Sequence, residues 1–350
     1  MQEQIIEQVQ KVSGRMKSIA NTSVQEVCAI GIIDIQNWEW AQGVGIYGLY
    51  RYYEYSRDEQ ELAWIRNWID RNIKKGLPQR NINTTAPMYT VAHLAETEGK
   101  YIDLCRDWAE WVMHGLARTK YDGFQHVVTG GENRQQLWDD TLFMTVLFLA
   151  KMGVMEKNAE YLRECERQFL LHAQYLMDRS TGLWYHGWTF DGNHNFANAR
   201  WARGNCWITA FIPDYLEMTG IDCGCGLYMR DVLRAQAEAL VRYQNSDGSW
   251  NTLIDDPDSY AEISATAGFA YGLLKGIRLG ILDESYRAPA MAAVRAVVRN
   301  IAPDGTVENV SYGTGMGMTL QDYRDIPICP MTYGQAITIM MLVEVLEHLA

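Results

Sequence analysis

Residues 142–150 read LFMTVLFLA, and nearly every position in this stretch is apolar. A helix that is apolar on all sides must be buried on all sides. Residues 265–274, ATAGFAYGLL, form a second stretch of this kind, rich in small side chains. Residues 58–75 instead carry charges along one face, which is typical of a surface helix. The chain therefore contains two kinds of helix, one buried and one amphipathic.

Helical patterns of both kinds recur from end to end, separated by turn signals such as Asp122-Gly123 and Asp247-Gly248. They predict twelve helices, at about residues 2–19, 37–55, 58–75, 86–97, 101–118, 138–152, 157–176, 196–217, 226–243, 260–279, 284–299 and 331–349. Twelve helices of alternating kind fit two concentric rings of six, so we predict an all-α fold, the (α/α)6 barrel. An open solenoid of helix pairs is the alternative, but no fixed-period repeat is visible.

No linker-like segment divides the chain, so we expect residues 1–350 to form a single catalytic domain. Short extended pieces at residues 183–188 and 249–253 are expected in loops at one rim of the barrel. Only 8 residues are proline, which suits a mostly helical chain because proline breaks helices.

Composition and charge exclude several classes of protein. The net charge of −12 argues against a nucleic-acid partner, because nucleic-acid grooves are normally lined by basic residues. No apolar stretch reaches 18 residues and no signal-peptide pattern opens the chain, so no membrane association is expected. The seven cysteines are scattered and form neither a disulfide framework nor a zinc motif. We therefore expect a cytoplasmic protein without a metal ion.

Tryptophans cluster beside polar residues at the predicted starts of apolar helices, at Trp40, Trp138, Trp201 and Trp207. Aromatic rings with scattered polar groups are typical of a sugar site, because a pyranose has an apolar face and a rim of hydroxyls. The alternative is core packing in which each indole N–H finds a partner. Several tryptophans at similar positions indicate a concave ligand pocket.

Two adjacent carboxylates, Asp139 and Asp140, directly precede the apolar stretch that begins at Leu142. Aspartate at a helix start can cap free N–H groups and complement the helix dipole, which lowers its pKa. Neighbouring helical residues point about 100° apart, so one carboxylate is expected to cap while the other faces a pocket. A catalytic acid needs the opposite pKa shift, which burial or a nearby substrate carboxylate would supply.

Polar groups gather in two further segments. Arg203 and Trp207 are four residues apart and share a helix face, where the guanidinium can hold a carboxylate in a bidentate pair or bridge to a helix end. His186 lies between aromatic residues in the segment WYHGW at 184–188. His126 is a weaker candidate.

In chain order, these segments resemble the glycoside hydrolase family 105 unsaturated rhamnogalacturonyl hydrolases, which are related to the family 88 unsaturated glucuronyl hydrolases. The similar segments are WEWAQGV (38–44), WDDTLFM (138–144), YHGW (185–188), WARGNCW (201–207), DGSW (247–250), EISATA (262–267) and YGQA (333–336). One departure is Cys206, which stands where glycine is expected. Residues 81–87 lack the additional aspartate that family 88 carries on an earlier inner helix, which favours family 105.

The resemblance implies an (α/α)6-barrel enzyme of the cytoplasm that needs no cofactor. Its substrate would be an oligosaccharide released by polysaccharide lyases, for example from pectin, with a 4,5-unsaturated uronic acid at the non-reducing end. The resemblance also implies that Asp140 is the catalytic acid/base. Together with Trp40 from the aromatic cluster, the residues expected to bind substrate are His186, Arg203, Trp201, Trp207, Trp138 and His126.

The expected chemistry is hydration of the C4=C5 vinyl ether, in which one residue serves as acid and then as base. Three alternatives remain on the same barrel. An inverting glycosidase needs a second carboxylate about 6.5–9.5 Å from the first, for which the candidates are Asp139, Asp191 and Glu262. A sugar epimerase would use His126 and His186 as bases. A non-catalytic sugar-binding protein would not depend on Asp140.

Overall fold

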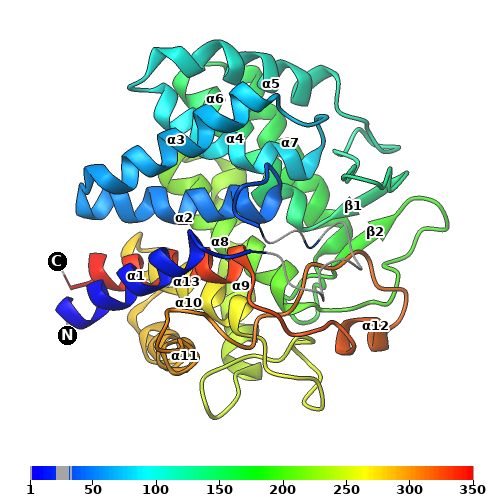
Figure 1. Cartoon of the computed structure of the whole chain (residues 1–350). Coiled ribbons are helices and arrows are strands. Elements are labelled where there is room, and N and C mark those ends of the chain that lie inside the picture. The colour runs from blue at the N-terminus through cyan, green and yellow to red at the C-terminus, as the bar shows by residue number, and fades with distance from the viewer. Residues whose placement is uncertain (1, 21–30, 32–33, 350) are drawn as a thin grey trace.

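The computed structural model describes residues 2–20, 31 and 34–349, and these residues are mostly helical (Figure 1). Each of the twelve predicted helices overlaps a helix of the structure. The α-helices are α1 (Gln2–Met16), α2 (Trp40–Ser56), α3 (Glu59–Lys75), α4 (Ile82–Ala95), α5 (Ile102–His114), α6 (Leu147–Met155), α7 (Ala159–Leu176), α8 (Ala202–Thr219), α9 (Gly224–Tyr243), α10 (Ile263–Arg278), α11 (Arg287–Arg299), α12 (Leu320–Arg324) and α13 (Thr332–Glu347). The short helix α12 was not predicted.

Six of these helices form a closed inner ring. Helices α2, α4, α6, α8, α10 and α13 pack each against the next, and α13 packs against α2 to complete the circle. Each inner helix also packs mainly against one helix of an outer ring, which consists of α1, α3, α5, α7, α9 and α11. The contact between α13 and α2 excludes an open solenoid and confirms the predicted (α/α)6 barrel.

The two rings differ as the sequence patterns require. Every residue of α10 from Ile263 to Ile277 is buried, whereas α3 buries only one stripe around Leu62, Ile65 and Ile69. Small residues let the inner helices approach closely. A Cβ at Gly43 of α2 would lie 2.5 Å from the backbone nitrogen of Pro87 in α4. The glycines of the inner helices are therefore part of the ring's packing.

Loops and short strands gather at the rim of the barrel where the inner helices begin. Two short antiparallel strands, β1 (Gln136–Trp138) and β2 (Gly187–Thr189), pair there, with Trp138 opposite Gly187. Figure 1 shows both strands and α12 on the side away from the two chain ends. Residues 249–253 also lie in loops at this rim, as expected, bridged through Leu253 to Trp201. The predicted helix start at Trp138 is wrong, because Trp138 belongs to β1.

The opposite rim, where the inner helices end, is held by buried ion pairs. The Lys275 ammonium of α10 lies 2.6 Å from Asp214 and 2.7 Å from Glu217, both on α8. Asp214 also accepts a hydrogen bond from Tyr47 of α2, at 3.2 Å. This far-end network (Tyr47, Asp214, Glu217 and Lys275) links three inner helices. None of the described helices combines the length and apolar character needed to cross a bilayer.

Candidate active site

A narrow pocket opens at the rim where the inner helices begin. Its lining comes mainly from the first residues of the inner helices and the loops before them: Trp40, Asn83, His126, Val128, Trp138, Asp140, Met144, Trp201, Arg203 and Thr314. Helix N-termini carry partial positive charge. Several such ends around one pocket favour a ligand with a negative group.

Strand pairing places Asp140 beside His186. The backbone N–H of Asp139 donates to the carbonyl of His186 at 3.1 Å, directly beyond the pair formed by Trp138 and Gly187. A π-helical turn, η4 (Leu142–Val146), follows the two aspartates before α6 begins. Such turns insert one extra residue into a helix and recur at functional sites. The local fold thus holds the carboxylate and the imidazole at fixed positions.

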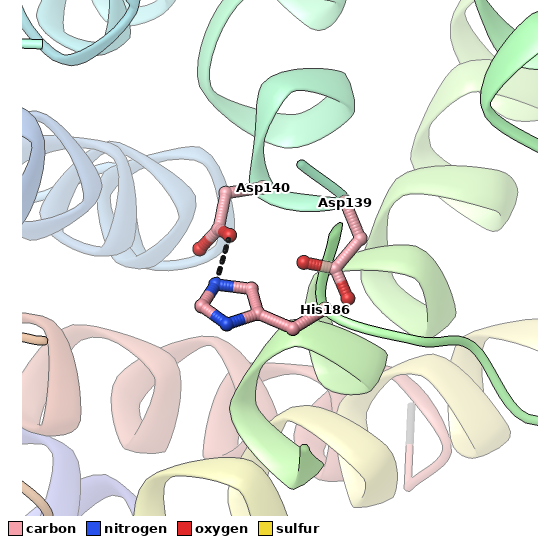
Figure 2. A group of neighbouring side chains, drawn as sticks. All are labelled: Asp139, Asp140 and His186. Carbon is pink, nitrogen blue, oxygen red and sulfur yellow. Dashed lines mark ion pairs between the residues drawn. The ribbon is translucent and has the colours of Figure 1, made fainter. Parts of the chain in front are cut away.

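Figure 2 shows the His186 ring directed at the Asp140 carboxylate, with Asp139 beside them. The distance from His186 Nε2 to Asp140 Oδ2 is 3.3 Å. The other ring nitrogen, Nδ1, lies 2.7 Å from the hydroxyl of Tyr323. An ionised carboxylate can only accept, so this arrangement places the imidazole proton on Nε2, and Nδ1 accepts from Tyr323.

The titration of Asp140 and His186 follows from this contact. Burial raises the pKa of Asp140, but the contact with His186 outweighs burial and holds that pKa below its ordinary value. Burial lowers the pKa of His186, and the neighbouring Asp140 only partly restores it. The free site therefore contains an ionised Asp140 and a neutral His186 at neutral pH.

His126 and Trp138 form one wall of the pocket. Their rings stack with centroids 4.2 Å apart and an angle of 11° between the planes. The Nδ1 atom of His126 lies 2.8 Å from the Thr141 hydroxyl. Burial lowers the pKa of His126 to about 3, so its ring is neutral at neutral pH. A neutral ring stacked on an indole suits a hydrogen-bonding wall of a sugar site.

Arg203 lies in the pocket with no acidic partner within ion-pair distance among the described residues. Its guanidinium donates to the carbonyl oxygens of Ser311 and Tyr312 at 3.2 and 3.1 Å, and to the Ser311 hydroxyl. The guanidinium carbon lies 4.3 Å from the centroid of Trp201 and 4.9 Å from that of Tyr333. Its Nε is buried without a hydrogen-bond partner. Among the described residues Arg203 therefore forms no salt bridge, which was one interpretation of the sequence.

Asp139 does not line the pocket. Its side chain is fully buried, and neither carboxyl oxygen has a hydrogen-bond partner among the described residues. It therefore does not cap the helix, contrary to the sequence-based expectation. Burial and then the charge of Asp140 raise the pKa of Asp139 well above its ordinary value. The prediction that only one of the two aspartates faces the pocket is confirmed, and that one is Asp140.

Most residues predicted to bind substrate come together at this pocket. Trp40, Trp138, Trp201, Arg203 and His126 line it with Asp140. The other two lie around it: His186 contacts Asp140, and the Trp207 ring lies edge-on to Trp40, at a centroid distance of 6.3 Å. Trp207 is 1% exposed and does not line the cavity. Its expected role in substrate binding stays a prediction.

Sequence reasoning missed several residues of the site. Asn83, Val128, Met144 and Thr314 also line the pocket, and Tyr323 orients His186. Asn83 lies in the segment 81–87, where the run of polar residues at the helix start is the signal that could have indicated it. Tyr323 is 137 residues from His186 in the chain. No local sequence pattern indicates a contact between residues so far apart in the chain.

The residues considered for an opposed carboxylate do not supply one. Asp140 is the only carboxylate among the described residues that line the pocket. Glu262 is fully buried and caps α10 through the amides of Ser264 and Ala265. Asp191 is exposed. The arrangement favours chemistry that needs a single acid/base group.

One group of side chains brings potential metal ligands together. Asp139, Asp140 and His186 each offer one ligand atom, all within 4.8 Å of one another. A structural zinc site takes four protein ligands, and metal binding requires deprotonated carboxylates. Asp139, whose raised pKa favours the protonated form, fits that role poorly. The absence of a metal cofactor stays a prediction.

A lone carboxylate facing a tryptophan-walled pocket on an (α/α)6 barrel is the arrangement of a carbohydrate-acting enzyme with this fold. Comparison with known families agrees with this class. The model of Glycosyl Hydrolase Family 88 matches residues 10–349, so the chain belongs to this family and is a glycoside hydrolase.

Comparison with individual relatives shows more specifically which glycoside hydrolases the chain resembles. It is 31% identical over 315 residues to the unsaturated rhamnogalacturonyl hydrolase YesR of Bacillus subtilis, covering 89% of this chain and 90% of YesR. Two crystal structures, each described as a possible member of the GH105 family, match with a TM-score of 0.96. The protein from Salmonella enterica serovar Paratyphi A is 42% identical, covering 100% of this chain and 95% of its own. The protein from Klebsiella pneumoniae is 44% identical, covering 99% and 94%. The predicted resemblance to family 105 is thus confirmed.

Proposed function

We propose that this enzyme removes a 4,5-unsaturated uronic acid from the non-reducing end of oligosaccharides that polysaccharide lyases produce, with rhamnose as the neighbouring sugar. The observation that carries the proposal is that one tryptophan-walled pocket holds both a carboxylate, Asp140, and a buried arginine, Arg203, that has no acidic partner among the described residues. The similarity to a rhamnogalacturonyl hydrolase supports the choice of substrate.

In the proposed reaction, protonated Asp140 delivers its proton to C4 of the unsaturated ring. Positive charge then develops at C5 and is shared with the ring oxygen. The Asp140 carboxylate takes a proton from water as the water adds to C5. The product is a hemiketal, which opens and releases the sugar on the reducing side. One residue serves both steps, so an opposed second carboxylate is not required.

The other pocket residues would bind and orient the substrate. Arg203 would hold the uronate carboxylate through its free Nε, since charged hydrogen bonds to carboxylates are the strongest of their kind. The carboxylate brought there would also raise the pKa of Asp140 toward the protonated form that the first step needs. Trp40, Trp138 and Trp201 would stack on the apolar faces of the sugars.

Several further features belong to this proposal. Residues 1–350 would form one catalytic domain that needs no cofactor. The enzyme would act in the cytoplasm, on products of pectin breakdown, without nucleic acid or membrane as a partner. Three buried cysteines are free thiols, which suits a reducing compartment: Cys105, Cys165 and Cys206.

The direct test is a panel of lyase products, followed by loss of the ultraviolet absorbance of the C4=C5 bond. Unsaturated galacturonyl-rhamnose is expected to be consumed fastest, and unsaturated glucuronyl-linked products more slowly. Hydrolysis of saturated glycosides at comparable rates would contradict the proposal and support an inverting glycosidase.

A further inference from the structure

A buried carboxyl group at the start of α2 has no part in the reaction described above. Glu39 directly precedes α2 and is 7% exposed. No lysine or arginine forms an ion pair with it among the described residues. A buried carboxylate is costly unless hydrogen bonds compensate its burial. The hydrogen-bond partners of Glu39 therefore show which parts of the site depend on it.

The partners of Glu39 come from three different walls of the pocket. On α2, its Oε2 atom accepts from the backbone N–H of Trp40 at 2.9 Å. On the loop before β1, the Thr129 hydroxyl donates to its Oε1 atom at 2.5 Å. On α4, the Asn83 side chain interacts with it. Trp40 and Asn83 line the pocket, and so does Val128, the neighbour of Thr129.

The Thr129 hydroxyl extends this contact to the start of α4. Its oxygen accepts from the side-chain amide of Asn81 at 3.2 Å, and Asn81 is the N-cap of α4. Beside it, the backbone N–H of Ile82 donates to the Val127 carbonyl at 2.9 Å. One carboxylate thus joins the start of α2, the start of α4 and the loop between the walls that they form.

The same contacts determine which way the Asn83 amide points. Burial raises the pKa of Glu39, and the interactions with Thr129, Trp40 and Asn83 lower it. A side chain that lowers the pKa of a carboxyl group in this way donates a hydrogen bond to it. An amide has one donor and one acceptor end. Asn83 therefore directs its N–H groups toward Glu39, and its oxygen is left to accept from a ligand.

We propose that Glu39 is a positioning residue that holds the Asn83 amide oxygen toward the pocket, where it accepts a hydrogen bond from a ring hydroxyl of the unsaturated uronate. Glu39 does not line the pocket, so it acts through Asn83 and the loop of Thr129. This inference rests on the proposed function. With C4 and C5 in a double bond, the ring keeps hydroxyl groups at C2 and C3, and one of these is the donor.

Equilibrium binding of deoxy analogues tests the proposal. The ligands are unsaturated galacturonyl-rhamnose and its 2-deoxy and 3-deoxy uronate analogues, and every protein carries Asp140→Asn so that no turnover occurs. With no further change, the protein is expected to bind one analogue roughly 2- to 12-fold more weakly, as for one lost hydrogen bond between neutral groups. Glu39→Gln is expected to abolish this discrimination, because the new amide lets Asn83 turn its N–H groups to the pocket. Asn83→Ala is expected to abolish it as well.

Asp58→Asn is the matched control, because it removes the N-cap carboxylate of the outer helix α3. It is expected to leave the discrimination unchanged. A purely structural role for Glu39 would weaken the binding of all three ligands equally, so equal weakening in Glu39→Gln overturns the proposal. Full discrimination in Glu39→Gln also overturns it.

Two further outcomes complete the test. If Glu39→Gln does not fold, Glu39→Asp serves instead, because the shorter carboxylate cannot reach Thr129 and Asn83 together; full discrimination there overturns the proposal. Lack of discrimination against both analogues before any change at Glu39 overturns it too. An enzyme with Asp140 intact that consumes no unsaturated substrate instead overturns the proposed function.

Discussion

The substitution Arg203→Lys tests whether Arg203 binds the substrate carboxylate through the geometry of its guanidinium group or only through its positive charge. The guanidinium spans the carbonyls of Ser311 and Tyr312, and its Nε has no hydrogen-bond partner among the described residues. A lysine keeps the positive charge, but its single ammonium cannot reach both carbonyls and the substrate together. A hydrogen bond between charged groups is worth about 1.5–3 kcal/mol, and about 1.4 kcal/mol corresponds to a factor of ten. We therefore expect KM to rise roughly 10- to 150-fold, with a smaller loss of kcat.

Initial rates from the ultraviolet absorbance of the substrate give both constants. Arg200→Lys is the matched control, because Arg200 pairs with Asp178 and Asp255 outside the pocket. A second substrate, with its uronate carboxyl group methyl-esterified, completes the test. The wild-type enzyme is expected to lose affinity for the ester, and Arg203→Lys is expected to discriminate little between ester and acid. Equal discrimination by both proteins would show that Arg203 is structural and would refute this reasoning.

Three further predictions address other parts of the molecule. Asp140→Asn is expected to fold normally and lose on the order of 10²-fold or more in kcat, as for a lost general acid; near wild-type turnover would remove Asp140 from the mechanism. Lys275→Met is expected to cost about 3–5 kcal/mol in the free energy of unfolding, because it leaves Asp214 buried and unpaired; urea unfolding measures this, and the double change with Asp214→Asn is expected to recover part of the loss. Burial within α7 lowers the pKa of His172 from its ordinary 6.5 to about 4, so the unfolded chain binds more protons between these values and stability falls as pH drops through this window. His172→Leu is expected to abolish about 2 kcal/mol of the stability difference between pH 7.5 and pH 5, and an unchanged difference would contradict it.

The barrel was predictable because a fully buried helix has a distinctive sequence that is apolar on all sides. Residues 142–150 and 265–274 are apolar all round, and both belong to the inner ring. The predicted helix starts were less accurate where tertiary contacts determine where a helix begins. Trp138 was placed in a helix, but pairing with Gly187 makes it the end of a strand. A strand of three residues is too short to give a recognisable alternation of apolar and polar residues in a single sequence.

The pocket was predictable in outline because most of its residues lie at the starts of the inner helices, and these starts lie together at one rim of the barrel. Local spacing did not reveal how they touch. The Asp140–His186 contact joins residues 46 positions apart, and the lining residue Thr314 comes from a loop that no motif marked. Asp139 was expected to cap a helix, but the strand and the π-helical turn around it turn the carboxyl group inward. Local sequence rules predict a capping role for Asp139, whereas the burial of its side chain is seen only in the folded structure.

Incorporation of solvent isotopes is the most direct test of the central claim. Protonation at C4 forms a new C–H bond from solvent, so reaction in heavy water is expected to place one deuterium at C4 of the released uronate. In ¹⁸O-labelled water the label is expected to enter at C5, with proton and water arriving on the same face because Asp140 serves both steps. Epimerisation would give deuterium without cleavage, and a binding protein would give neither. A cleaved product without deuterium at C4, with the label at C1 of the uronate, would contradict hydration and show direct displacement at the glycosidic bond.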